Sequence, residues 1–171
     1  MNHITHAVVQ KYSVSARIFH WIGALLIVAA WVLIEQGDDY LSLHKAVGVS
    51  FLIWTVLRIL NRLVSKAPPP VPMSKLQTGI AHLVHFGLYV AMLGMPLTGL
   101  LASLYDGVSV SVFGLFQIPA FATTNYDLAE QLMGVHQDLM WPLLLGLVGA
   151  HILGALHHQF ILKDNLIARM R

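Results

Sequence analysis

The sequence predicts an all-α integral membrane protein that folds as a four-helix bundle in one domain, residues 1–171. Hydrophobic residues make up 57% of the chain and charged residues only 11%, whereas a soluble domain carries about 25% charged residues. Four apolar stretches are each about as long as the roughly 20 residues that a helix needs to cross a bilayer. Basic and acidic residues also segregate to opposite ends of these stretches, which fits four crossings.

The four spans are expected near residues 18–36, 43–64, 78–104 and 137–162. A signal peptide is the alternative for the first, but no A-x-A-like cleavage site precedes Glu35, so an uncleaved span is favoured. The second is uncharged only over 46–57, and its flanking Lys45, Arg58 and Arg62 can snorkel to the membrane surface. The third lies in a charge-free stretch, and the fourth has 24 residues without Asp, Glu, Lys or Arg.

The connectors are expected to be a short turn at 36–40, a stiff proline-rich segment at 65–74 and an outer loop at 105–135. Residues 107–126 in that loop are also uncharged, but they carry Ser109, Ser111 and Gln117 among other polar residues. A fifth crossing would also move the basic C-terminus to the other side of the membrane. This stretch is therefore interpreted as a loop at the outer surface.

The charges predict the orientation of the bundle. With both termini in the cytoplasm, nine of the ten basic residues lie inside: Lys11, Arg17, Arg58, Arg62, Lys66, Lys75, Lys163, Arg169 and Arg171. Seven of the eight acidic residues then lie outside: Glu35, Asp38, Asp39, Asp106, Asp127, Glu130 and Asp138. This arrangement satisfies the positive-inside rule. We expect a multi-pass protein of the bacterial inner membrane, in contact with lipid and with no nucleic-acid partner.

The chain has no cysteine and ten histidines. The missing thiols exclude disulfides, thiolate metal sites, the usual iron–sulfur clusters and covalently attached c-type haem. Any haem-type cofactor must be held by His or Met. Because ionisable residues inside a membrane are costly, the intramembrane histidines are candidates for a functional role.

Four histidines can be paired by their depth in the membrane. His136 and His151 are fifteen residues apart in the fourth span, which is about 22 Å and about 60° of rotation along one helical stripe. His44, at the outer end of the second span, matches His136, and His20, near the inner end of the first span, matches His151. Each pair bridges two helices, as the axial ligands of a bis-histidine haem b do. Plain hydrogen-bonded packing is the alternative role.

Glycines support this pairing. Gly23, Gly48 and Gly154 follow His20, His44 and His151 by three or four residues, so each lies one turn away on the same helix face. A residue without a side chain lets a flat macrocycle lie against the backbone, although small residues also serve ordinary helix packing.

Other residues are candidates for secondary contacts. Arg17, Arg58, Arg62 and His158 are expected to contact haem propionates, with lipid phosphate as the alternative for the arginines and water for His158. His82 and His85 share a helix face and compete with His20 and His151 as ligands. A quinone pocket or a haem propionate is favoured for these two histidines, with structural hydrogen bonding as the alternative. We expect no specific role for His157, His3 and His6.

The sequence resembles the prokaryotic cytochrome b561 family. The resemblance is carried by RIFHWIGALLI (17–27), LHKAVGVSFLIWTVLRILNRL (43–63), GIAHLVHFGLYVAMLGMPLTGL (79–100), VHQDLM (135–140) and GAHILGALHHQFILKDNLIARM (149–170). It implies two haem b groups, ligated at the positions that match His20, His44, His136 and His151, and electron exchange with the ubiquinone/ubiquinol pool. Some relatives oxidise superoxide, but the predicted outer face is acidic and would repel that anion.

The favoured function is transmembrane electron transfer, with two irons that change only their oxidation state. If the protein is an enzyme, it is an oxidoreductase that uses quinone, with superoxide as a second candidate substrate, and no residue is assigned as catalytic. One alternative is a cytochrome b subunit that anchors a periplasmic redox enzyme. An alternative of another class is a histidine-lined transporter of divalent metal, which would need acidic residues deep in the spans, where the sequence has none.

Overall fold

The computed structural model describes residues 10–171, so His3 and His6 lie outside the described residues. Its main elements are the helices α1 (Val14–Glu35), α2 (Leu41–Val64), α3 (Lys75–Tyr105), α4 (Tyr126–Gly134) and α5 (Trp141–Leu156) and the strands β1 (Val110–Val112) and β2 (Phe116–Ile118). The π-helical segment η2 (Val135–Met140) joins α4 to α5, and a second one, η3 (His157–Leu162), extends α5, so Tyr126–Leu162 is one continuous helix. The short 3-10 helices are η1 (Asp38–Tyr40) and η4 (Leu166–Met170).

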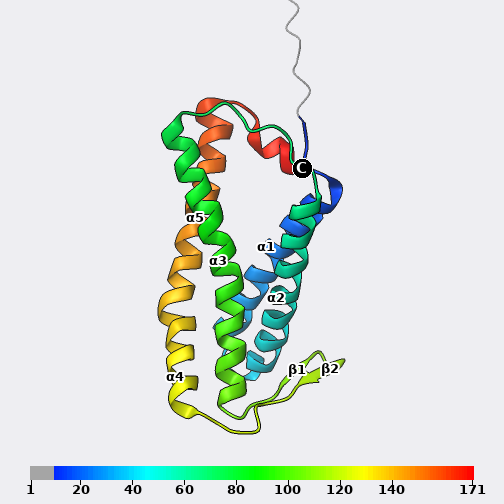
Figure 1. Ribbon diagram of the computed structural model, residues 1–171, viewed down its shortest axis with the longest axis vertical. Helices are drawn as coiled ribbons and strands as arrows, with labels where there is room; N and C mark the ends of the chain where they lie inside the picture. Colours follow the sequence, from blue (N-terminus) through cyan, green and yellow to red (C-terminus); the bar gives the residue numbers. More distant parts are fainter. Residues whose placement is uncertain (1–9) are drawn as a thin grey trace, which may run out of the picture.

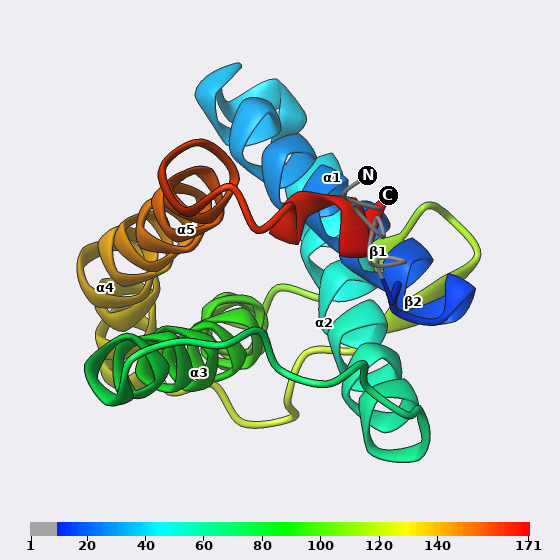
Figure 2. The ribbon, with the colours of Figure 1, turned by 90° about the horizontal axis from the view of Figure 1, so that it is seen from above.

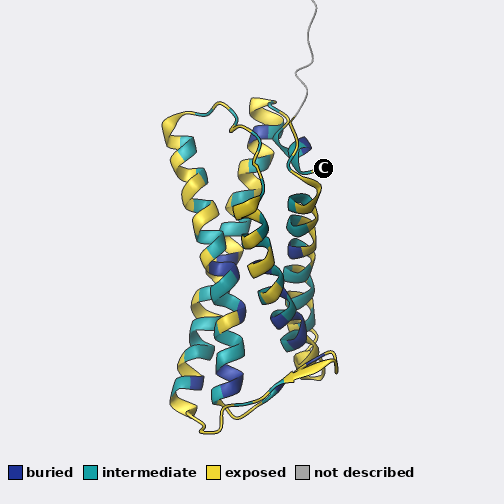
Figure 3. Ribbon diagram, turned by 45° about the vertical axis from the view of Figure 1, so that its right-hand side comes forward, coloured by how far each residue is buried: buried dark blue, intermediate teal, exposed yellow. Residues whose placement is uncertain are grey.

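Four helical stretches in residues 10–171 are long and apolar enough to cross a membrane: Val14–Glu35, Asp38–Val64, Lys75–Tyr105 and Tyr126–Leu162. They stand side by side along the long axis of the molecule (Figure 1). Their outward faces carry exposed apolar side chains. Figure 3 shows exposed positions along the length of the bundle. Such a surface suits lipid rather than water. The predicted all-α four-helix membrane fold is confirmed.

Polar caps begin three of the helices. The Ser13 hydroxyl accepts a hydrogen bond from the Ala16 amide at 3.2 Å, and the Asn125 side chain accepts one from Leu128 at 3.1 Å. Ser74 and Gln77 form a reciprocal capping box at the start of α3. These bonds satisfy amides that have no partner inside a helix.

The predicted outer loop at 105–135 is more ordered than the sequence indicated. It contains an antiparallel hairpin, in which Ser111 pairs with Gln117, and the whole of α4. The fourth helix therefore begins at Tyr126 rather than near residue 137. Its first turns are amphipathic, because Ala129 is buried while Asp127 and Glu130 are exposed. Because Asp127 and Glu130 interrupt the apolar run, the apolar length of the sequence indicated a loop in this segment.

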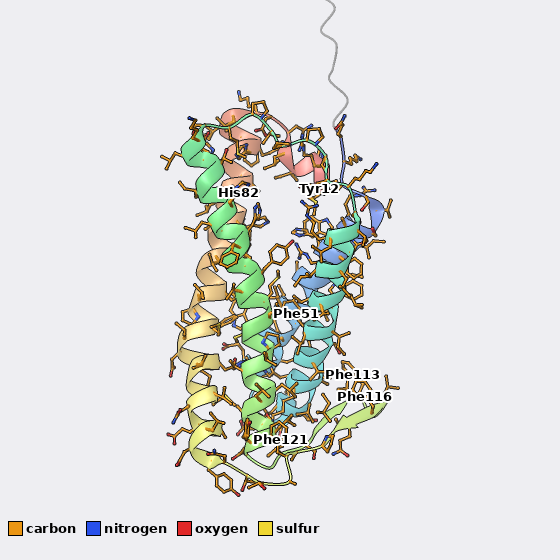
Figure 4. The ribbon with its side chains drawn as sticks, in the orientation of Figure 1. Tyr12, Phe51, His82, Phe113, Phe116 and Phe121 are labelled. Atoms are coloured by element: carbon orange, nitrogen blue, oxygen red, sulfur yellow. The ribbon has the colours of Figure 1, made fainter. Side chains whose placement is uncertain are left out.

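The bundle consists of two helix pairs. α1 packs on α2, α3 packs on the α4–α5 helix, and α2 packs on α3 to join the pairs. Seen from above, the helices surround a central space (Figure 2). Midway along the bundle this space is filled by an apolar cluster of Phe51, Ala91, Met92 and Leu144, called the central cluster below. Figure 4 places Phe51 at this middle level.

The two ends of the bundle are distinct. The hairpin end comprises residues 35–45 and 105–138, and the tail end comprises residues 10–20, 58–85 and 151–171. At the tail end the Tyr12 amide donates to the Arg169 carbonyl at 3.0 Å, and the Trp21 indole donates to the Met170 carbonyl at 2.8 Å. Residues 10–13 and the C-terminus therefore lie at the same end.

Candidate functional site

His44 and His136 meet at the hairpin end. His44 lies in the first turn of α2 and His136 in the π-helical segment η2, and their ring centres are 6.3 Å apart with an interplanar angle of 86°. Both rings are partly buried between the helices. The structure thus brings together two imidazoles that are 92 positions apart in the chain.

Backbone carbonyls orient both rings of this pair. The Nδ1–H of His44 donates to the Ala30 carbonyl at 2.8 Å, and the Nδ1–H of His136 donates to the Met95 carbonyl at 2.7 Å. Because a carbonyl can only accept, Nδ1 carries the proton in each neutral ring, and the lone pair is left on Nε2. A hydrogen bond of this kind fixes the orientation of a metal-binding imidazole and raises its basicity.

Local backbone features place His136. A π-helical turn inserts an extra residue into the helix, and such turns are frequent at functional sites. On the facing helix, a Cβ atom at Gly99 would lie 2.7 Å from Cε1 and 2.8 Å from Nδ1 of His136. The ring therefore occupies the space that any other residue at position 99 would fill. The sequence analysis missed Gly99, because finding it requires knowing which residue of the facing helix meets His136.

His20 and His151 meet at the tail end. Their ring centres are 6.0 Å apart at an interplanar angle of 60°. His85 of α3 lies close by, 5.4 Å from the His151 ring centre. The Arg58 Nη2 group lies 3.2 Å from Nδ1 of His20 and donates to it. Three histidines from three helices and one arginine therefore converge at this level.

Tight packing of α1 on α2 positions His20 and Arg58. Trp54 donates from its indole nitrogen to the Phe19 carbonyl at 3.0 Å. Gly23 is buried, and a Cβ there would lie 3.6 Å from Trp54 and 3.7 Å from Arg58. The glycine thus lets Trp54 and Arg58 approach α1 next to His20. The sequence analysis expected Gly23 to leave room for a flat macrocycle beside His20, whereas the structure places Trp54 and Arg58 against it.

The remaining residues that the sequence predicted as propionate or quinone contacts do not all lie beside the histidine pairs. His82, His157 and Arg62 are exposed. Arg17 donates from Nη1 to the Arg171 carbonyl. His158 is buried and its Nδ1 lies 2.5 Å from the Asp164 carboxylate. The structure therefore groups Arg58 and His85 with the tail-end pair, whereas Arg17 and His158 bind the C-terminal segment.

The hairpin-end pair fits a haem iron held from two sides. The tail-end pair has a similar ring spacing, but the hydrogen bond from Arg58 to Nδ1 of His20 puts the proton of that neutral ring on Nε2. Imidazoles on opposite sides of one metal ion, each with a nitrogen–metal bond of about 2 Å, have ring centres roughly 6 Å apart. A Cβ at Gly48 or at Gly154 would have no other atom within 4 Å, so the backbone beside His44 and His151 is open. Among residues 10–171, no three His, Asp or Glu side chains are grouped to hold a bare metal ion. The donor set is thus two imidazoles at the hairpin end and three, His20, His85 and His151, at the tail end.

The comparison with known proteins agrees with this chemistry. Residues 11–171 match the family model described as prokaryotic cytochrome b561. The chain belongs to this family. It is therefore a multi-pass bacterial membrane cytochrome that binds b-type haem and transfers electrons.

Curated relatives of this cytochrome are similar over nearly their whole length. "Probable superoxide oxidase CybB" of Yersinia pestis is 34% identical, and the match covers 94% of this chain and 96% of the relative. "Cytochrome b561 homolog 2" of Escherichia coli (strain K12) is 30% identical, with 94% of this chain and 91% of the relative covered. "Cytochrome b561 homolog 1" of the same organism is 27% identical over a similar extent.

Proposed function

We propose that this cytochrome is a dihaem protein of the inner membrane that carries electrons between the periplasmic face and the quinone pool. His44 and His136 hold one haem b, and His20 and His151 hold the other. The observation that carries the proposal is the spacing of the two pairs, with ring centres 6.3 Å and 6.0 Å apart at opposite ends of the bundle.

The bound haem supplies one-electron chemistry between Fe(III) and Fe(II). Two histidines at each haem would leave no iron position for oxygen, so these residues would favour electron transfer over oxygen chemistry. The carbonyls of Ala30 and Met95 hold the hairpin-end imidazoles in the tautomer that presents Nε2. The central cluster keeps water out between the two levels.

We place quinone exchange at the tail end. His85 lies beside the tail-end pair and His82 is exposed one turn away, so these two are the proposed contacts of quinone or of a haem propionate. Arg58 is the arginine best placed for a propionate, because it already contacts His20. The positive charge at the tail end supports a cytoplasmic location for this face.

Superoxide is a second candidate donor, favoured by the printed name of the Yersinia pestis relative. The charge of the hairpin end opposes it, because seven acidic residues lie there with Lys45 as the one basic residue. Lys45 lines a shallow depression together with Asp38 and Ser42 next to the hairpin. Stopped-flow reduction of the purified protein by superoxide and by ubiquinol distinguishes the donors. Reduction by ubiquinol alone would exclude superoxide.

The two-haem assignment is tested by removing ligands. His44→Ala and His136→Ala should each halve the haem-to-protein ratio and leave one bis-histidine spectrum, since the tail-end pair stays intact. His157→Ala, in an exposed neighbour of His158, is the matched control and should keep two haems. Two haems in both ligand variants would refute the assignment, and a colourless wild-type protein would refute haem binding altogether.

The anchor-subunit alternative makes a separate prediction. A cytochrome that anchors a periplasmic redox enzyme should copurify with that enzyme from native membranes solubilised in mild detergent. Isolation of the cytochrome by itself, still reducible by ubiquinol, would favour an independent electron carrier.

A further inference from the structure

The turn of the β1–β2 hairpin presents apolar side chains to the outside of the molecule. Phe113, Leu115 and Phe116 are 54%, 82% and 48% exposed. They belong to the hairpin tip, defined here as residues 113–116, and Figure 4 labels its two phenylalanines. Figure 1 shows the hairpin reaching sideways past the start of α2, and Figure 2 shows it outside the central space. An exposed apolar patch of this kind marks a contact with a partner or a membrane.

The strands behind this tip are fixed to the bundle. Val110 and Val112 of β1 are buried in an apolar cluster with Val49 of α2. The Ser109 hydroxyl also accepts a hydrogen bond from the Ala120 amide at 2.9 Å, which closes the base of the hairpin. The packing of the strands therefore determines where the tip lies, and the tip is held outward.

The backbone of the turn supplies a second observation. Phe113 has a φ of 52° and Gly114 has a φ of 72°. The Leu115 amide donates to the Val112 carbonyl at 3.0 Å. This is the pattern of a type I′ turn, in which Asn-Gly is the usual pair. A bulky residue with positive φ is strained, and such strain persists only where the surroundings offset it. The ring at position 113 therefore needs an apolar environment.

The hairpin tip adjoins the surface that faces lipid. Phe113 lines a shallow depression with Tyr40 and Leu43, where η1 passes into α2, and Asp39 also lines it. Tyr40 and Leu43 are exposed, and the outer face of α2 continues from them with exposed apolar side chains. Tyrosine is enriched at the boundary between a membrane and water. The tip is thus continuous with the lipid-facing surface at the level where a span begins.

We propose that the hairpin tip inserts into the headgroup region of the adjacent leaflet, as a membrane contact additional to the four spanning helices. Residues 107–126 carry no charge that would oppose insertion. The tip reaches the boundary between headgroups and acyl chains rather than the centre of the bilayer, because the backbone groups of a turn need polar partners. This inference goes beyond the proposed electron transfer and holds for either orientation of the bundle.

The test is electron paramagnetic resonance of the full-length protein in phosphatidylcholine nanodiscs. The chain has no cysteine, so Leu115→Cys carries a single nitroxide label. Relative to nitrogen, this label should collide more often with oxygen, which dissolves in lipid, than with a water-soluble nickel chelate. The ratio should place it about 5–10 Å into the headgroup/acyl boundary. Gln117→Cys is the matched control, because Gln117 is an exposed polar residue of the same hairpin and its label should favour the nickel chelate.

A second variant tests the strained ring itself. Phe113→Asn in the Leu115→Cys background suits the type I′ turn and removes the ring, so it should preserve the hairpin and shift the label toward water. An unchanged depth in this variant overturns the inference.

The other possible occupants of the tip give different results. Preferential access of the nickel chelate to Leu115→Cys in nanodiscs overturns the inference, and it is the result expected of a tip that binds a partner protein. Protection from both reagents, with dipolar broadening between labels, assigns the tip to a second copy of the chain and overturns the inference as well.

Discussion

Three glycines of α3 determine how closely the fourth helix can approach. A Cβ at Gly87 would lie 3.0 Å from Leu147, and one at Gly94 would lie 3.0 Å from Met140, whose side chains are flexible. At Gly99 the obstacle is the rigid ring of His136, at 2.7 Å. The sequence pointed to glycines one turn from His20, His44 and His151 on their own helices. It could not identify Gly99, because that requires knowing which face of α3 meets His136.

Gly99→Val should displace His136 and disrupt the hairpin-end haem while the tail-end haem is retained. The added side chain overlaps the ring, so the Nδ1 bond to Met95 must lengthen and the pairing with His44 is lost. The haem-to-protein ratio and the reduced-minus-oxidised spectrum measure this, with about half of the haem remaining. Gly79→Val is the control, since a Cβ there meets no atom within 4 Å. Full haem content in Gly99→Val would contradict the prediction.

The π-helical segment η2 sets the phase between His136 and α5. A π-helical turn contains one residue more than an α-helical turn. This extra residue lies between the hairpin end and the rest of the helix. The sequence placed His136 and His151 on one stripe by counting α-helical turns, which ignores this insertion. The histidine pairs nevertheless meet, because α2 and α1 supply partners at each level independently.

Deletion of Gln137 should convert this segment to a regular α-helix. His136 and α4 would then rotate by about 100° relative to α5. The hairpin-end haem should be lost and the tail-end haem kept, as judged by haem content and by potentiometry. Gln137→Ala changes the same exposed side chain without altering the phase and should bind two haems. Equal haem content in the two variants would show that the π-helical turn is dispensable.

The C-terminal segment crosses the tail end and joins three parts of the fold. After η3 the chain reverses through Lys163 and Asn165, both with positive φ, and η4 then reaches α1. The Asp164 carboxylate connects this reversal to His158 at 2.5 Å and accepts from the Leu166 amide at 3.2 Å. Arg169 donates to the Pro69 carbonyl at 2.7 Å, which attaches the proline-rich connector.

Asp164→Ala should loosen the C-terminal segment without unfolding the bundle. Losing a charged hydrogen bond to a buried histidine costs about 2 kcal/mol, or roughly a thirtyfold increase in the open population. Limited trypsin digestion in detergent should therefore cleave after Lys163 correspondingly faster. The control is His157→Ala, which alters the exposed neighbour of His158. Identical cleavage rates in wild type and Asp164→Ala would mean that this contact does not hold the segment.

Much of the architecture follows from physical rules that act on sequence alone. Apolar length and the absence of charge identified four spanning helices, because a membrane imposes the same requirement on every span. Amphipathic α4 was missed, since Asp127 and Glu130 interrupt the apolar run. The contact between Arg58 and His20 was also not predicted, because it depends on how α1 and α2 rotate against each other.

The orientation of the bundle is open to direct measurement. A green fluorescent protein fused after Arg171 should fluoresce, because the positive-inside rule predicts that the basic tail end faces the cytoplasm. Alkaline phosphatase inserted after Ala122, in the connector between β2 and α4, should be active in the periplasm. Phosphatase activity from a fusion at Arg171 would reverse the assignment and would place the acidic end inside.

The central cluster separates the two histidine levels by a layer without charged side chains. An electron that passes between the two proposed haems would therefore move through part of the membrane voltage without a compensating ion. A full crossing of 100 mV corresponds to about 2.3 kcal/mol, and in the proposed orientation the cell's inside-negative voltage pushes the electron back toward the hairpin end. In oriented proteoliposomes, an imposed voltage should shift the share of reduced haem between the levels. The ratio of reduced haem at the two levels would then report the voltage across the membrane.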